Sequence, residues 1–183
     1  MSDYFLFVGL PYAAFAIMLI GSILRYMDRG FTVSSLSTQF LEGKSLFWGS
    51  QPFHWGMMFL FFGHLVAFLF PASVIAFNGD PVRLLILEVT AFAFGLATLF
   101  GIIMLVIRRL TNKRVQIVTS KMDMVVFATL LTQIISGVYI AYFHRYGSTW
   151  FAASLTPYLR SIFAFNPDMS VVASMPLAVK IHV

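Results

Sequence analysis

The sequence predicts an all-α integral membrane protein, a bundle of transmembrane helices. Sixty per cent of its 183 residues are hydrophobic and only 10% are charged, and the mean hydropathy is +0.88. Soluble domains are about half apolar and about a quarter charged. The apolar residues also gather in long runs, with lysine and arginine at their ends, as in bilayer-spanning proteins. We expect residues 1–183 to form a single transmembrane domain.

Four apolar runs are long enough to cross the bilayer. A spanning helix needs about 20 residues, because each adds about 1.5 Å toward a hydrocarbon thickness of about 30 Å. The runs are Tyr4–Leu24, Phe53 to about Phe77, Leu84–Ile107 and Met124–Phe143. Pro71 is expected to kink or end the second helix. In the fourth run, the polar residues Thr132, Gln133 and Ser136 favour a helix interface over a lipid-facing surface.

The remaining segments connect these spans or begin another. Residues 144–175 mix aromatic residues with Pro157 and Pro167, which is typical of an ordered segment near the membrane interface. A fifth helix begins at Pro176 and is truncated at Val183, so we expect the protein to continue beyond this sequence. The first run lacks the basic start and small-residue cleavage motif of a signal peptide, and we interpret it as a mature first span.

The basic residues predict the orientation. The side expected to be cytoplasmic carries Arg25, Arg29, Lys44, Arg108, Arg109, Lys113, Arg114 and Lys121, against Arg83, Arg145 and Arg160 on the other side. The richer side is normally cytoplasmic, which places the N-terminus outside. The net charge of +5 therefore reflects topology, and no nucleic-acid partner is expected. Partner docking is a second possible role for the basic residues of the 108–123 loop.

Histidine is the residue type that points to a cofactor. The chain has no cysteine, so it cannot itself bind an iron–sulfur cluster through thiolates. His54 and His64 both lie in the second span, about 15 Å apart along the axis. Neutral imidazole is an axial ligand of haem iron, whereas an unpartnered histidine in hydrocarbon is costly. Gly56 and Gly63 beside them would let a flat macrocycle approach the backbone. The alternative is that each histidine simply bonds a neighbouring helix.

A third histidine lies in the fifth helix. His182 enters from the outer side, so we expect it to meet the deeper, outward residue His64 and not His54. Two histidines on one iron leave no open position, which favours electron transfer over oxygen chemistry. His144, at the outer end of the fourth span, is interpreted as an interfacial anchor.

Several short stretches together resemble one family. They are Gly21 to Tyr26, Gln39 and Leu41, Phe53-His54 with Gly56, Gly63-His64, Arg108 to Leu110, and Arg114-Val115. They occur in order along most of the chain. The pattern resembles the cytochrome b (gamma) subunit of membrane-bound respiratory nitrate reductase.

This resemblance implies a fold and a function. The fold is a five-helix membrane bundle in the bacterial cytoplasmic membrane, with two b haems between the second and fifth helices. The function is oxidation of menaquinol or ubiquinol near the outer face, with electrons passing inward to a cytoplasmic iron–sulfur (beta) subunit and a molybdenum catalytic (alpha) subunit. The enzyme would thus be a quinol:nitrate oxidoreductase whose nitrate chemistry occurs on another polypeptide.

The resemblance also implies site residues. His64 and His182 are similar to the outer haem ligands, and His54 to one inner ligand, whose partner would lie beyond Val183. Gly63 and His64 would also line the quinol pocket, and Tyr26 would lie near the inner haem. Arg83 falls where the family has a basic residue near the quinol, with arginine in place of lysine.

Glu88 is the one acidic residue deep in a predicted span. An intramembrane carboxylate suggests function, so Glu88 is a candidate to take up a quinol proton. Pairing with Arg83 or with a partner subunit is the alternative. For the whole chain, the alternatives are the haem b subunit of another quinone-linked complex, such as one of dissimilatory sulfur metabolism, or a cofactor-free membrane scaffold. The sequence does not distinguish the quinone, the haem potentials or the terminal acceptor.

Overall fold

The computed structural model describes residues 2–29, 41 and 43–183, and these residues are largely helical. The helices fall into two compact units, formed by residues 1–36 with 158–175 and by residues 37–157 with 176–183. We call them unit 1 and unit 2. The predicted all-α class is confirmed, whereas the single-domain interpretation stays a prediction.

Unit 1 combines the N-terminal helices with part of the 144–175 segment. Its elements are α1 (Ser2–Tyr4), the π-helical turn η1 (Phe5–Gly9), α2 (Leu10–Arg29), most of α9 (Thr156–Phe163) and α10 (Ser170–Ser174). The Tyr158 hydroxyl donates to the Phe7 carbonyl at 2.5 Å, and the Tyr12 hydroxyl donates to the Ile162 carbonyl at 2.8 Å. The predicted order of the 144–175 segment is therefore confirmed.

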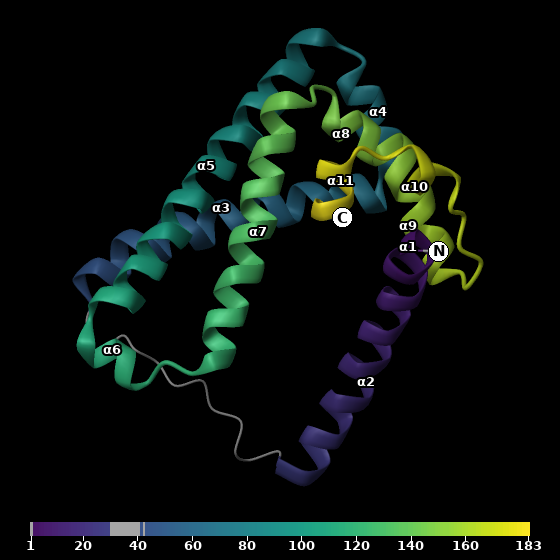
Figure 1. Cartoon of the computed structure of the whole chain (residues 1–183). Helices are drawn as coiled ribbons and strands as arrows, with labels where there is room; N and C mark the ends of the chain where they lie inside the picture. Colours follow the sequence, from purple (N-terminus) through teal and green to yellow (C-terminus); the bar gives the residue numbers. More distant parts are fainter. Residues whose placement is uncertain (1, 30–40, 42) are drawn as a thin grey trace. The chain divides into compact units, whose positions relative to one another are not determined.

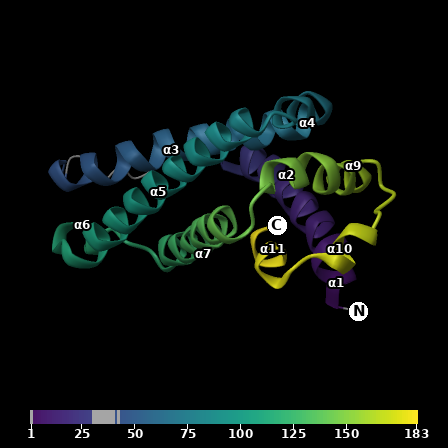
Figure 2. The same ribbon diagram turned by 90° about the horizontal axis from the view of Figure 1, so that it is seen from above.

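Unit 2 holds the other long helices. They are α3 (Lys44–Leu69), α4 (Pro71–Asn78), α5 (Pro81–Thr111), α6 (Lys113–Ile117) and α7 (Lys121–Phe143), followed by α8 (Gly147–Trp150), the π-helical turn η3 (Phe151–Leu155) and α11 (Leu177–His182). In both ribbon views α5 runs beside α3 and α7, and α11 lies against α7 (Figures 1 and 2).

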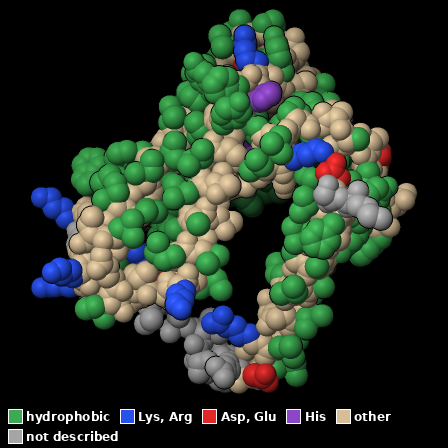
Figure 3. All heavy atoms as spheres, in the orientation of Figure 1, with side chains coloured by type: hydrophobic (Ala, Val, Ile, Leu, Met, Phe, Trp, Pro, Cys, Tyr) green, Lys and Arg blue, Asp and Glu red, His purple; other side chains and the backbone are tan. Residues whose placement is uncertain are grey.

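Four helices among the described residues are long and apolar enough to cross a membrane. They are Phe5–Asp28, Lys44–Leu69, Pro81–Thr111 and Lys121–Phe143. Hydrophobic side chains cover much of the surface of unit 2, and lysine and arginine gather at the end that carries α6 (Figure 3). Such an apolar surface is what a protein dissolved in lipid presents. The four predicted spans are thus confirmed in number and order.

The second span begins earlier than predicted. It starts at Lys44, not Phe53, and ends at Leu69, because Phe70 has a non-helical backbone (φ −125°, ψ 56°) before Pro71. Pro71 ends the helix as predicted and occupies the first turn of α4, where a missing N–H is tolerated. Pro52 lies inside α3, although the predicted span began only at Phe53. His54 is consequently ten residues into the helix, about 15 Å from its start, and not at its mouth.

Close backbone contact between α3 and α5 explains this longer helix. A Cβ atom added to Gly101 of α5 would lie 2.5 Å from the Phe53 nitrogen and 2.6 Å from the Gly49 carbonyl oxygen. Gly49 and Gly56 of α3 are both buried. Small residues let membrane helices approach at this distance, where dispersion contacts replace the hydrophobic driving force that lipid removes. The contact fixes α3 against α5 and so sets the direction in which its histidines project.

Candidate functional site

The two histidines of α3 are oriented in the same way. His54 Nδ1 lies 2.7 Å from the Ser50 carbonyl oxygen and 3.1 Å from the Ser50 hydroxyl. His64 Nδ1 lies 2.7 Å from the Leu60 carbonyl oxygen. A carbonyl can only accept, so Nδ1 must carry the proton and Nε2 keeps its lone pair. This is the tautomer that a metal-binding histidine adopts when its second nitrogen is held by a carbonyl.

His182 on α11 shows the same arrangement through contacts with another helix. Its Nδ1 lies 3.1 Å from the Gln133 carbonyl oxygen and 3.2 Å from the Ser136 hydroxyl, both on α7. The Gln133 side-chain amide donates to the His182 carbonyl at 2.7 Å. The Nδ1 nitrogen is again the bonded one, so all three histidines can offer Nε2 to a ligand. Among the described residues no hydrogen bond occupies any of these Nε2 atoms.

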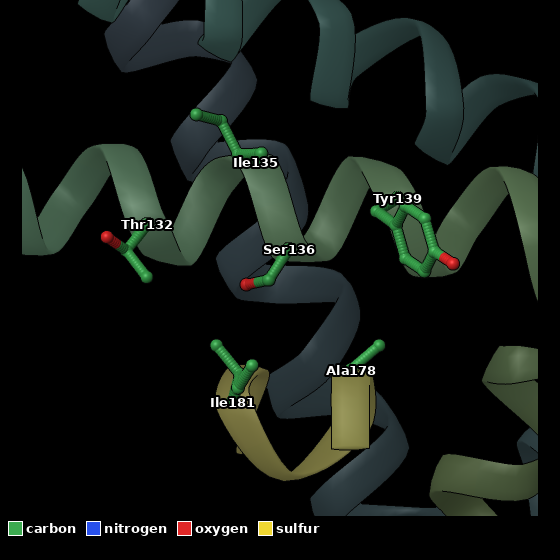
Figure 4. A pocket seen from close by; sticks show the side chains of 6 residues that line it. All are labelled: Thr132, Ile135, Ser136, Tyr139, Ala178 and Ile181. Carbon is green, nitrogen blue, oxygen red and sulfur yellow. The ribbon is translucent and has the colours of Figure 1, made fainter. Parts of the chain in front are cut away.

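Gly137 makes room for the His182 ring. A Cβ atom at Gly137 would lie 2.7 Å from the ring's Cε1 atom. Any larger residue there would push the imidazole away from α7. A groove of about 350 Å³ opens beside this contact, lined by Thr132, Ile135, Ser136 and Tyr139 of α7 and by Ala178 and Ile181 of α11, with the Ser136 side chain directed toward α11 (Figure 4). The polar step predicted to suit a helix interface thus does so, against α11.

The structure brings His64 and His182 near each other. The two imidazoles are close enough for their charges to interact. Phe151 of η3 contacts the His64 ring edge-to-face, with centroids 5.3 Å apart and an interplanar angle of 88°. At Gly63 an added Cβ would meet no atom within 4 Å. The space beside His64 is therefore open on the glycine side and bounded by an aromatic ring on another.

Gly56, in contrast, has a packing role that the sequence interpretation did not foresee. A Cβ atom there would collide with the Thr98 hydroxyl and lie 2.7 Å from the Phe94 carbonyl oxygen. Both atoms belong to α5, so Gly56 faces a helix and we do not place it in a cofactor site. Closeness to a histidine in the sequence was a poor guide, because residues two positions apart on a helix point to nearly opposite sides.

Arg83, which is predicted to lie near the quinol, is at the end of unit 2 where α5 begins. Asp80 caps α5 by accepting the N–H groups of Val82 and Arg83 at 3.0 and 2.9 Å, and the bond from Arg83 is the main cause that lowers the Asp80 pKa. The Arg83 side chain is about half exposed, 4.0 Å from Asp80, with its guanidinium over the Phe77 ring at 5.3 Å. A cation held loosely at a rim is free to turn toward an anionic or hydroxyl ligand.

Glu88 does not pair with Arg83. Its carboxylate accepts the Tyr146 N–H at 2.7 Å and contacts the Arg145 guanidinium at 3.5 Å. This corrects the suggested Arg83 pair, since the cation comes instead from the far end of α7. Both carboxylate oxygens have a structural contact, and the uptake of a quinol proton by Glu88 stays a prediction.

Other predicted residues lie elsewhere. Tyr26 belongs to unit 1 and is 79% exposed, so its predicted place near an inner haem stays a prediction. Gln39 lies outside the described residues. His144 forms the C-cap of α7, with its ring 6.3 Å from that of Tyr139. The sequence interpretation missed Gly137 and Phe151, because only the folded chain brings them against a histidine.

Comparison with known proteins gives the same assignment over nearly the whole chain. The family model described as nitrate reductase gamma subunit matches residues 3–183. The chain belongs to the nitrate reductase gamma subunit family. It is 33% identical to the nitrate reductase gamma chain of Bacillus subtilis over 187 residues, covering 100% of this chain and 83% of that one. The predicted family is therefore confirmed.

The chain matches a smaller part of two further relatives. The respiratory nitrate reductase 2 gamma chain of Escherichia coli is 33% identical over 129 residues, which is 70% of this chain and 57% of that one. A nitrate reductase-like protein, NarX, of Mycobacterium tuberculosis is 29% identical over 189 residues, with 94% and 27% covered. This gamma subunit is a multi-pass membrane protein of the nitrate reductase type.

Proposed function

We propose that this gamma subunit binds haem b and carries electrons from quinol toward the partner subunits of a nitrate reductase. The observation that supports this most is the shared orientation of His54, His64 and His182. Each Nδ1 lies within hydrogen-bond distance of a backbone carbonyl, which leaves the lone pair of each Nε2 available to a ligand. Among the described residues, no neighbouring helix bonds any of these three Nε2 atoms.

His64 and His182 are the pair that we propose for the outer haem. They come from α3 and α11, and a bis-histidine pair would hold a haem between those helices. The haem would supply one-electron chemistry, because two protein ligands leave its iron no open position. The residues themselves contribute orientation: the carbonyls of Leu60 and Gln133 fix the rings, and Gly63 leaves space beside one of them. His54 is proposed as a ligand of the inner haem.

Quinol oxidation is proposed at the end of unit 2 that carries Arg83. Releasing two protons and two electrons there needs a hydrogen-bonding group at the rim and an electron acceptor nearby. Arg83, whose side chain is about half exposed and 4.0 Å from Asp80, can donate to a quinol oxygen. By the charge distribution this end faces outward. The electrons would pass inward, to the side where Arg109, Lys113 and Arg114 gather, and on to the iron–sulfur and molybdenum subunits.

The test is quinol-driven reduction of the purified complex. The protein isolated from membranes with its partner subunits should show a b-type haem spectrum, and a reduced quinol analogue should reduce that haem. Added nitrate should then reoxidise it. A protein without haem would refute the cofactor proposal. Haem that quinol cannot reduce, although dithionite can, would refute the quinol step alone.

A further inference from the structure

The stretch from Arg145 to Thr156 is fixed to the rest of unit 2 by three separate polar contacts. The first is at its beginning, where Glu88 of α5 accepts the Tyr146 N–H at 2.7 Å and meets Arg145 at 3.5 Å. Tyr146 has a left-handed backbone with φ of 66°. That conformation costs free energy in a residue with a Cβ and persists only where the surroundings hold it. The carboxylate on its N–H is such a restraint.

The second contact comes from the end of α4. The Asn78 side-chain amide, buried in the structure, donates to the Ser148 and Thr149 hydroxyls, each at 3.0 Å. The third comes from the break between α3 and α4. Pro71 has no N–H, so the Ala67 carbonyl loses its usual helical donor, and the Thr156 hydroxyl approaches it at 3.4 Å instead.

Phe151 lies between these contacts, with its ring edge-to-face against His64. The neighbouring Ala152 and Leu155 are almost fully buried, at 2% and 3% exposure. The segment therefore places one aromatic ring against the side of His64 that Gly63 does not leave open. Its position on unit 2 depends on polar groups far away in the sequence. We call residues 145–156 the capping segment.

We propose that Glu88 is a positioning residue: through the Tyr146 N–H it seats the capping segment, so that Phe151 fixes and shields the His64 ring. The N–H bond matters more than the ion pair. Arg145 is 61% exposed, and an exposed pair contributes little, whereas Glu88 is only 19% exposed and 2.7 Å from the amide nitrogen. The redox consequence rests on the proposed function, since it takes His64 as a haem ligand.

The expected effect follows from charge. Oxidised haem carries one more positive charge than reduced haem, and excluding water disfavours the charged form. Loosening the capping segment would admit water beside His64, stabilise the oxidised form and lower the midpoint potential. We expect Glu88→Ala to change the redox equilibrium of the His64 haem by three- to tenfold, where tenfold is about 59 mV for one electron.

Two measurements test this on the full complex in membranes. The first is a redox titration of each b haem. The second needs no haem: because the chain has no cysteine, Ala152→Cys places a single thiol on a buried position of the capping segment. Its maleimide labelling should be slow with Glu88 present and at least tenfold faster with Glu88→Ala. In Glu88→Gln the amide oxygen still accepts the Tyr146 N–H. Its midpoint potential and its labelling rate should therefore lie close to those of the parent protein.

Asp123 supplies a matched control. It also accepts a backbone N–H, from Ser120 at 2.8 Å, and contacts an arginine, Arg109 at 3.3 Å, but at the opposite end of α7. Asp123→Ala should leave the labelling rate and the outer haem potential unchanged. An unchanged labelling rate in Glu88→Ala would overturn the proposed seat. Faster labelling with an unchanged potential would overturn the positioning of His64.

The remaining outcomes are also decisive. If the parent complex contains no haem, the proposed function fails, and the labelling rates still decide whether Glu88 seats the segment. If Glu88→Ala does not accumulate in membranes, Thr149→Val takes its place. That change is nearly isosteric and removes one acceptor of the Asn78 amide. It should accelerate labelling by a smaller factor, and no acceleration would contradict the proposal.

Discussion

Two glycines of α3, Gly63 and Gly56, should respond differently to substitution by alanine: one in haem binding and the other in stability. Gly63→Ala adds a methyl group where no atom lies within 4 Å, so the chain should fold and insert normally. If a haem occupies the space beside His64, however, the methyl group meets the macrocycle. Gly56→Ala adds the same group against α5, where it collides with Thr98.

The magnitudes follow from the contacts. At Gly56 the new Cβ would lie 2.7 Å from the Phe94 carbonyl oxygen, and ordinary contact begins at 3.4 Å. The helices must therefore separate by about 0.7 Å at this point, because the contacting atom is a backbone oxygen and cannot rotate away as a side chain could. Overpacking of this kind costs about 1–3 kcal/mol. At Gly63 we expect no loss of stability but a loss of outer haem affinity of about tenfold, or about 1.4 kcal/mol.

The assay compares thermal unfolding in detergent with haem content per polypeptide. Gly56→Ala should lower the melting temperature and reduce both haems together, because α3 carries ligands of each. Gly63→Ala should keep the melting temperature of the haem-free protein and lose one haem. A Gly63→Ala protein with full haem content and an unshifted spectrum would refute the idea that haem occupies this space. A Gly56→Ala protein of unchanged stability would refute the packing argument.

Three further predictions concern single side chains. Arg83→Ala should slow quinol oxidation about ten- to a hundredfold, as expected for the loss of a charged hydrogen bond, and should leave the haem content intact. Arg83→Lys should restore most of the rate, and unchanged quinol kinetics in Arg83→Ala would argue against this site. Ser136→Ala should weaken retention of the outer haem about tenfold in competition with apomyoglobin, as second-sphere losses do, whereas Thr132→Ala, whose hydroxyl bonds the Ala128 carbonyl, should not. Because the Asp80 pKa is lowered on folding, its carboxylate stabilises above its unfolded pKa and that stabilisation is lost as pH falls through the folded value. Asp80→Asn should flatten this acid limb of the melting temperature between about pH 5 and about pH 3, and an unaltered limb would contradict the assigned cap.

Most of the fold could be predicted from the sequence because the bilayer imposes a simple rule of length and polarity. Runs such as Leu84–Ile107 and Met124–Phe143 lie within the observed helices α5 and α7. The beginning of α3 could not be predicted in this way. Residues 44–52 contain Lys44, Gly49 and Pro52, which suggest a loop, and they are helical because Gly49 packs against α5. That contact is between distant parts of the chain and leaves no local pattern.

The candidate site was predictable where chemistry alone identifies the residue. Histidine in an apolar span is costly, so His54 and His64 stand out in the sequence. The use of each glycine and carboxylate was not predictable, because it depends on which helix face meets which neighbour. Gly56 packs on Thr98, and Glu88 holds the backbone of Tyr146, a residue 58 positions later. The sequence showed that these residues were unusual but not what they contact.

The most direct test of the central claim is haem content in His64→Ala, His182→Ala and the double variant, measured per polypeptide by pyridine haemochrome and low-temperature spectra. If one iron is held between α3 and α11, each single variant should lose the same spectral component, and the double variant should lose no more than either. His144→Ala, at the end of α7, should lose none. Loss of different components in the two single variants, or additive loss in the double variant, would contradict the pairing.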